Sequence, residues 1–183
     1  MAPMATYAVL LRGVNVGGHN KVPMRALQEL LASDGHRDVR TYVQSGNVVL
    51  RTRLGADALA ARVESLLAEA MGLSVPSVVR SGPQLAEIVA ANPFLAPGRD
   101  PGRQLHVAFL AADPDPEGLA GLDPRRAAPE ELSVRGRDIY LWCPEGLGQS
   151  KVMQGVERRL ATAATVRNWR TVTELLRMAD DGN

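Results

Sequence analysis

The apolar residues in the first half of the chain fall into short continuous runs and longer stretches with helical spacing. Residues 6–12 form a β-prone run typical of a buried strand, and leucines at helical spacing predict a helix over residues 23–33. Further runs predict strands at 39–43, 48–52 and 75–80, and a longer pattern predicts a helix at 56–71. The predicted order is therefore βαββαβ, the ferredoxin-like arrangement.

The second half of the chain is expected to repeat this order. Ser81 and Gln84 have the spacing of a capping box, and the helix they start is predicted to end near residue 91. Later patterns predict strands at 105–110, 132–134, 139–142 and 163–167, a short or irregular segment at 116–122, a helix at 151–160 and a last helix ending near 178. We therefore expect an α+β protein made by tandem duplication of two ferredoxin-like subdomains, each an antiparallel sheet with helices on one face. The subdomains are predicted at residues 1–92 and 104–183, with a proline- and glycine-rich linker at 93–103.

A comparison of residues supports the duplication. When 77–89 is aligned with 164–176, three of the thirteen positions are identical, and Ser81 stands opposite Asn168. Both residues are favoured helix N-caps. The competing interpretation is that any capped amphipathic helix following a strand aligns in this way.

Composition and charge narrow the class of protein. The chain has 183 residues, of which 45% are apolar and 22% charged, as expected for a folded globular protein. Its apolar runs are shorter than the roughly 20 residues of a membrane span, and its N-terminus lacks signal-peptide features, so we expect a cytoplasmic protein without a membrane partner. The net charge of +1 indicates no global attraction for nucleic acid. Cys143 is the only cysteine, which excludes an internal disulfide and a multi-cysteine metal site.

A glycine-rich loop between the first strand and the first helix is the main candidate for binding. It runs from Arg12 to Lys21 with the sequence Arg-Gly-Val-Asn-Val-Gly-Gly-His-Asn-Lys. Backbone N–H groups in such a turn can hold an anion, and a lysine adds full charge. It is not a Walker motif, because His19 stands at the lysine position. The alternative is that the glycines only turn the chain and an asparagine caps it.

Cations and polar residues elsewhere extend the hypothesis. Lys21 and Lys151 are the only lysines beside nineteen arginines, and each follows a glycine-bearing loop at a predicted helix start, where a cation opposes the helix dipole. Gln44 to Asn47 supply more polar groups than a tight hairpin needs, which fits either a ligand contact or a bulge. The first and third strands of such a unit are neighbours, so we expect this turn to lie near Gly13. Arg80 and Arg167 precede helix caps and either face an anion or pair with Glu87 and Glu174.

Other chemistry has little support in the sequence. The three histidines are dispersed, and His36 is expected in a solvated loop. Cys143 ends a predicted strand and is expected in the core rather than as a nucleophile. The chain has two Trp, three Tyr and two Phe, too few for the base stacking of RNA-recognition domains. No metal or cofactor site is predicted, and whether the protein is an enzyme is left open.

Four motifs together resemble those of the bacterial domain-of-unknown-function (DUF) 1697 family. They are Leu-Arg-Gly-Val-Asn-Val-Gly-Gly at 11–18, Lys-Val-Pro-Met at 21–24, Thr-Tyr-Val-Gln-Ser-Gly-Asn-Val at 41–48 and Val-Arg-Asn-Trp-Arg-Thr-Val at 166–172. The resemblance spans nearly the whole chain and implies an α+β fold of two ferredoxin-like halves, but no reaction. The family's motif positions fall on Arg12, Gly13, Asn15, Gly17, Gly18, Lys21, Gln44, Ser45, Gly46, Asn47, Lys151, Arg167, Asn168 and Trp169.

Three functional hypotheses follow. The first is that Arg12, the loop 13–21 and the turn 44–47 bind a small anionic or phosphorylated ligand, with Lys151, Arg167 and Asn168 as candidates in the second half. The second is nucleic-acid binding through arginine contacts, which would depend steeply on salt. The third is a non-catalytic homodimer joined through sheet faces or edges.

Overall fold

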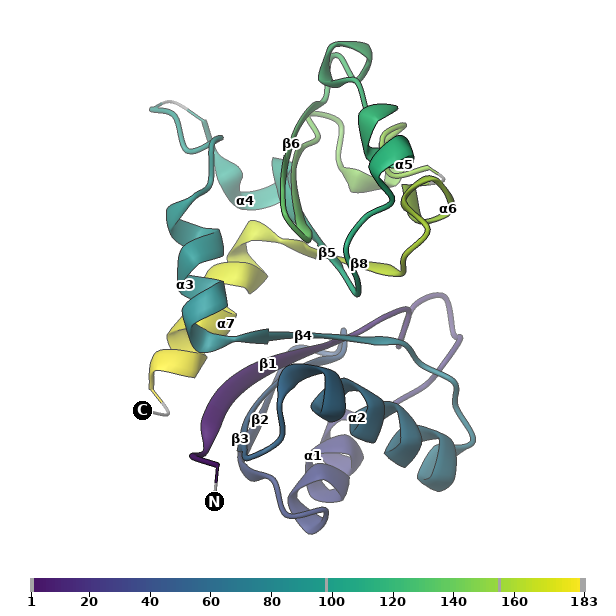
Figure 1. Cartoon of the computed structure of the whole chain (residues 1–183), viewed down its shortest axis with the longest axis vertical. Helices are drawn as coiled ribbons and strands as arrows, with labels where there is room; N and C mark the ends of the chain where they lie inside the picture. The colour runs from purple at the N-terminus through teal and green to yellow at the C-terminus, as the bar shows by residue number, and fades with distance from the viewer. Residues whose placement is uncertain (1, 98, 155, 182–183) are drawn as a thin grey trace. The chain divides into compact units, whose positions relative to one another are not determined.

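The computed structural model describes residues 2–97, 99–154 and 156–181 and shows an α+β chain with two four-stranded antiparallel sheets (Figure 1). The chain divides into two compact units. The first comprises Met1–Glu87 and Glu174–Asn183, and the second comprises Ile88–Thr173.

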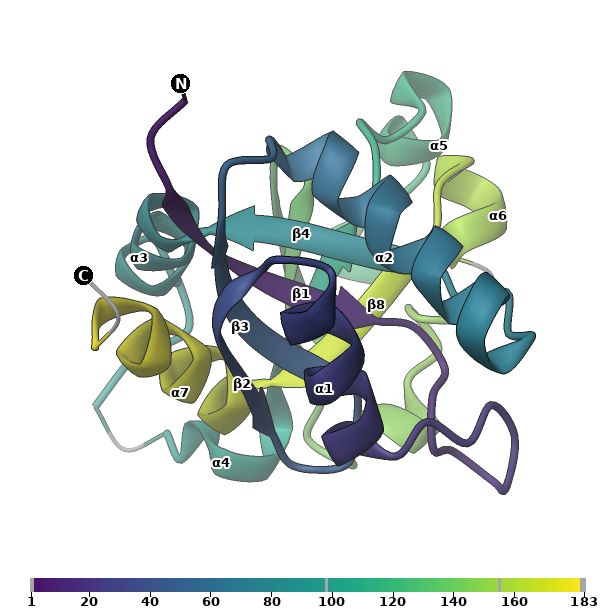
Figure 2. The ribbon, with the colours of Figure 1, turned by 90° about the horizontal axis from the view of Figure 1, so that it is seen from below.

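The first unit is a sheet with two helices on one face. Its strands are β1 (Ala5–Leu11), β2 (Arg37–Tyr42), β3 (Asn47–Thr52) and β4 (Ser77–Ser81), in the order β2-β3-β1-β4. The helices α1 (Met24–Ser33) and α2 (Ala56–Met71) cover the sheet (Figure 2). Val9 and Leu50 from the strands pack with Leu27 and Val63 from the helices in one buried core. The buried runs of the strands and the leucines at helical spacing in the helices form this core, as predicted.

The second unit repeats the topology with shorter helices. Its strands are β5 (Leu105–Leu110), β6 (Glu131–Arg135), β7 (Asp138–Trp142) and β8 (Ala164–Asn168), in the order β6-β7-β5-β8. The other elements are α4 (Pro101–Gln104), α5 (Pro116–Ala120), η1 (Pro124–Arg126), η2 (Leu147–Gln149) and α6 (Val156–Leu160). The matching strand orders confirm the predicted pair of ferredoxin-like subdomains.

The capping residues confirm the two helix starts that the sequence predicts after β4 and β8. Ser81 and Gln84 form a capping box at α3 (Gly82–Ala90): the Ser81 N–H donates to Gln84 Oε1 at 2.8 Å, and the Gln84 N–H donates to Ser81 Oγ at 3.3 Å. At α7 (Trp169–Asp180), the Thr171 N–H donates to Asn168 Oδ1 at 2.8 Å. Both strand-to-helix joints therefore use the cap that the sequence predicts.

Both of these helices cross the boundary between the units. In the second unit, the carbonyl of Ile88 in α3 accepts a hydrogen bond from the Tyr140 hydroxyl at 2.7 Å. In the first unit, the carbonyl of Met178 in α7 accepts one from Arg40 Nη2. Each unit therefore contains the end of a helix that begins in the other.

The start of one predicted helix in the second half differs from the structure. The helix expected at 151–160 begins only at Val156, because Glu130 accepts hydrogen bonds from the Ser150 hydroxyl (2.6 Å) and the Lys151 N–H (2.8 Å) and holds that stretch outside the helix. Residues 101–103 of the predicted linker form the start of α4, whose first turn is capped by Asp100.

The described residues contain neither a membrane-spanning helix nor a cluster of metal-ligating side chains. No helix in residues 2–97, 99–154 and 156–181 has the length and apolar character to cross a bilayer. The same residues contain no group of three or more His, Cys, Asp or Glu side chains placed to hold a metal ion.

Candidate functional site

The glycine-rich loop and the β2–β3 turn lie together at one end of the first sheet. We call residues 12–22 and 43–47 the tip. The Leu11 N–H donates to the carbonyl of Gly46 at 2.8 Å, and Asn15 Nδ2 donates to the carbonyl of Gln44 at 2.7 Å. Figure 2 shows the loop projecting from the end of β1 before the chain returns into α1. The expected proximity of the two segments is confirmed.

Asn15 fastens the tip. Besides its bond to the turn, its Nδ2 donates to the carbonyl of Val22 at 2.9 Å, and its Oδ1 accepts from the Val22 N–H at 2.9 Å. Its backbone has φ +56°, a left-handed conformation that asparagine tolerates better than most residues. A further backbone bond joins the Asn15 N–H to the carbonyl of Asn20 at 3.1 Å. The side-chain amide of Asn15 therefore holds the loop in shape.

Gly46 and Asn47 are buried and hold the β2–β3 turn in its conformation. A Cβ at Gly46 would lie 2.5 Å from Val14 Cγ2 and 2.8 Å from Leu11 Cβ, and the residue has φ +77°. Only glycine fits this combination of close approach and positive φ. Asn47 is fully buried, and its Nδ2 donates to the Tyr42 carbonyl (3.1 Å) and to Ser45 Oγ (2.9 Å). Contact of these two residues with a ligand stays a prediction.

Val43 is a strained residue that the sequence pattern did not indicate. It was predicted to end the second strand, but it lies beyond β2 with φ +49° and 51% of its surface exposed. A β-branched residue in the left-handed region costs roughly 1–3 kcal/mol. Val16, in the facing loop, is 65% exposed. Strain and exposed apolar groups coincide at the tip.

The exposed side chains of the tip carry positive charge. Arg12 and Lys21 are both exposed, and so are Gln44 and Ser45. The sequence has no aspartate or glutamate at 1–28 or at 39–56, so the tip itself contributes no negative side chain. Gly17 and Gly18 are exposed with φ +57° and +79°, and they make a tight turn in which the His19 N–H donates to the carbonyl of Val16 at 3.0 Å.

Two of the second-half candidates have structural contacts. Arg167 is buried, and its Nη1 donates to Thr165 Oγ1 at 2.7 Å and to the carbonyl of Val166 at 3.0 Å. Burial lowers the pKa of Arg167 to about 10, so the guanidinium stays charged at neutral pH. Asn168 caps α7. A ligand contact by either residue stays a prediction.

Lys151 lines a cavity of about 220 Å³ in the second unit. Glu130 and Glu145 line it too, so carboxylates outnumber the ammonium and the charge does not favour an anion. Cys143 is also in the wall, where burial and the charge of Glu130 raise the pKa of its thiol. The thiol is protonated at neutral pH, which agrees with its predicted place in the core.

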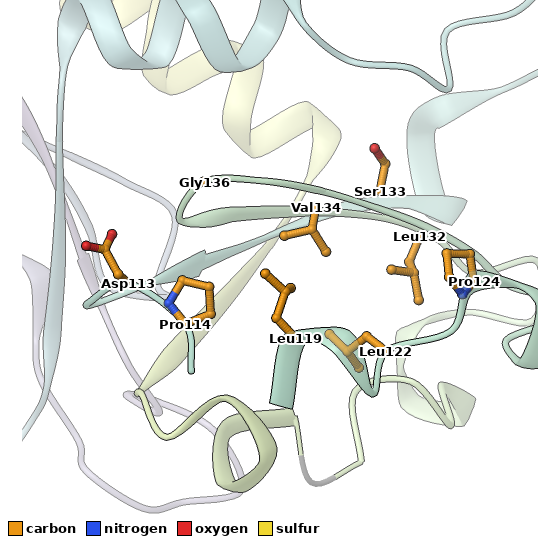
Figure 3. A pocket seen from close by; sticks show the side chains of 9 residues that line it. All are labelled: Asp113, Pro114, Leu119, Leu122, Pro124, Leu132, Ser133, Val134 and Gly136. Atoms are coloured by element: carbon orange, nitrogen blue, oxygen red, sulfur yellow. The ribbon is translucent and has the colours of Figure 1, made fainter. Parts of the chain in front are cut away.

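A larger apolar cavity of about 680 Å³ lies between α5 and the β6–β7 hairpin (Figure 3). The side chains of Leu119, Leu122 and Leu132 project toward one another, whereas the Ser133 hydroxyl points away from them (Figure 3). No function was predicted for this region from the sequence. The only sequence signal for this cavity was the short helical pattern that follows the first strand of the second half.

His36 is buried, contrary to its expected place in a solvated loop. Its exposed fraction is 6%. The reason is a Schellman motif at the end of α1, in which the Gly35 N–H donates to the carbonyl of Ala32 and the His36 N–H to that of Leu31. This motif turns the residue after the glycine back toward the helix, so His36 occupies a position that usually holds an apolar side chain.

Comparison with known proteins agrees with the fold and the motifs. The chain resembles a solved structure, that of the conserved bacterial protein SP0830 from Streptococcus pneumoniae, with a TM-score of 0.75 and 22% identity over 97% of this chain and 99% of that one. At this identity the likeness shows the fold alone. A search of curated proteins gives no match. Residues 4–140 match the family described as protein of unknown function (DUF1697), and because this match covers most of the chain, the protein belongs to that family.

Proposed function

We propose that the tip binds the anionic group of a small ligand, with Arg12 and Lys21 supplying the charge. The observation that carries the proposal is the placement of two exposed cations in a hydrogen-bonded assembly whose own segments contain no acidic residue. Because these segments contain no aspartate or glutamate, an arriving anion meets no repelling carboxylate from the tip itself.

The tip is also organised before a ligand arrives. Asn15 joins the loop to the turn, so part of the entropy needed to order the binding groups is already lost on folding. A Cβ at Gly18 would meet no atom within 4 Å, which shows open space beside the exposed backbone of the loop. A ligand can therefore approach the backbone here.

A thermal-shift screen tests the proposal. Sugar phosphates, nucleotides and oligonucleotides would be added to the wild type and to Lys21→Ala, because specific binding raises the melting temperature by mass action. The matched control is Arg25→Ala, which removes a cation whose side chain is 91% exposed on α1 and paired with Glu29. We expect a shift in the wild type and in Arg25→Ala, and a smaller shift in Lys21→Ala.

Two other outcomes would change the conclusion. Equal shifts in all three proteins would remove the tip as the binding site. Stabilisation by oligonucleotides alone, lost steeply with added salt, would favour the nucleic-acid hypothesis instead.

A further inference from the structure

A basic cavity lies at the opposite end of the first sheet from the tip. Its volume is about 460 Å³, within the range of small-molecule sites. Met4, just before β1, and Thr52, paired with Ala5 at the start of β1, contribute to its wall, whereas the tip lies beyond Leu11 at the other end of that strand. The charged and polar side chains that matter here are Asp34, His36, Arg37, Thr52, Arg53 and Arg62.

The single carboxylate among these groups is already neutralised by Arg62. Arg62 Nε lies 2.9 Å from Asp34 Oδ2 and 3.1 Å from Oδ1, and its Nη2 also donates to Oδ1. The hydrogen bonds from Arg62 hold the pKa of the Asp34 carboxyl below its ordinary value. The pair therefore contributes no net charge to the cavity.

Arg37 and Arg53 are left uncompensated. Both are exposed, and neither side chain has a hydrogen-bond or ion-pair partner within residues 2–97, 99–154 and 156–181. The β2–β3 register also sets Arg37 directly opposite Arg51, an unfavourable pairing of like charges. Asp38 lies 3.4 Å from Arg51 Nη1 and so offsets the charge of Arg51 rather than that of Arg37. A concentration of charge that weakens the fold locally suggests a functional use.

His36 supplies a second, independent observation. Its side chain is 4% exposed and lines the cavity, and its Nε2 has no hydrogen-bond partner in the part of the chain that the structure describes. The nearest charged group recorded for that nitrogen is Asp34 Oδ2, at 3.4 Å. Burial lowers the pKa of His36, so the ring is neutral at pH 7 and one buried polar atom lacks a partner.

We propose that this cavity binds a dianionic phosphate monoester, with Arg37 and Arg53 as its charged contacts. Two unpaired guanidiniums match the charge of such a group near neutral pH, and their forked N–H donors suit its oxygens. The hydrogen-bonded pair of Arg62 and Asp34 lines the cavity beside His36, and Thr52 adds a hydroxyl. The volume exceeds that of a phosphate group, so the organic part of the ester enters as well.

Calorimetric titration with inorganic phosphate and glycerol phosphate tests the proposal. The wild type is expected to bind glycerol phosphate, and Arg37→Ala/Arg53→Ala to bind it at least about tenfold more weakly, since charge-assisted hydrogen bonds are lost. Arg25→Ala again serves as the matched control, because it removes an exposed arginine from the same unit. The Arg37→Lys/Arg53→Lys variant, which keeps the charge, should restore part of the affinity.

A second readout separates this cavity from the tip. Proton–nitrogen NMR of the imidazole in wild-type protein should show the His36 Nε2 resonance shifting during the glycerol phosphate titration, with the same midpoint as the heat. Lys21→Ala should leave this titration unchanged, whatever it does to binding at the tip. Absence of binding to the wild type, equal affinity in the double alanine variant, or loss of binding in Lys21→Ala would each overturn the proposal.

Discussion

The two units share one topology but cover their sheets differently. After β1, the chain forms the hydrogen-bonded tip loop and then the ten residues of α1, whereas after β5 it forms only the five residues of α5. At about 1.5 Å per residue, α5 is half as long as α1. The first sheet consequently has a filled core and a polar loop, and the second has an apolar cavity beside its hairpin. The shorter helix after β5 therefore leaves a cavity beside the hairpin, although the rest of that face packs in a buried core of its own.

We expect the largest difference in stability between glycine substitutions in the two hairpin turns. Gly46→Ala should destabilise the protein by about 3 kcal/mol, because the new Cβ would overlap Val14 and Leu11 at a positive φ. Gly136→Ala, in the corresponding turn of the second unit, should cost only about 1 kcal/mol, since its Cβ would meet no atom within 4 Å. Urea denaturation of both variants measures the difference. Equal costs would show that Gly46 is not held against the loop.

We expect the next largest difference in stability between leucine substitutions in α1 and α5. Leu27 in α1 is fully buried, so Leu27→Ala should cost about 3 kcal/mol through lost burial and the cavity left behind. Leu119 in α5 is half-buried beside an existing cavity, so Leu119→Ala should cost about 1 kcal/mol. The midpoints of urea unfolding give both values. A larger cost at Leu119 would contradict the open packing of the second unit.

A smaller effect tests the fastening of the tip. Asn15→Ala removes three hydrogen bonds and leaves the carbonyl of Gln44 and both backbone groups of Val22 without that partner, at a cost of about 2 kcal/mol. Asn20→Ala removes one long bond to the Gly13 carbonyl and should cost less than about 1 kcal/mol. Amide hydrogen exchange should rise throughout the tip in the first variant. Unchanged exchange there would show that Asn15 does not hold the loop.

The smallest effect concerns pH, since each unit buries one histidine. Burial lowers the pKa of both His36 and His106 below the ordinary value. Below about pH 6.5 the unfolded chain therefore binds more protons than the native one. As the pH is lowered, the free energy of unfolding should fall by at most about 1.4 kcal/mol per pH unit for each histidine. Urea titrations between about pH 7 and 5 measure the slope. Each of His36→Gln and His106→Gln should reduce it, and a slope unchanged in both would contradict the assignment.

The sequence was sufficient for the strands, most helices and the duplication because these depend on local periodicity and caps. Ser81 and Asn168 are examples, since an N-cap acts within one turn of its own helix. The proximity of Gly46 to the loop also followed, because topology alone makes β1 and β3 neighbours.

The remaining features depend on tertiary contacts that no local pattern records. Glu130 delays the start of α6 from twenty residues away. The burial of His36 depends on a helix end meeting the sheet, and the strained φ of Val43 on the register of a turn. Local periodicity therefore misplaced residues whose surroundings are set by tertiary contacts. One of them, His36, supplies the buried polar atom without a partner in the proposed phosphate cavity.

The crossing of α3 and α7 between the units has a consequence for biosynthesis. The first sheet is translated early, but residues 174–181, which belong to the same unit, are translated only after the whole of the second unit. The first unit therefore stays incomplete until these residues have been synthesised. A cut after residue 173 would remove part of the first unit and leave the second unit whole. Limited proteolysis near the carboxyl end should accordingly loosen β1 to β4 before it affects β5 to β8.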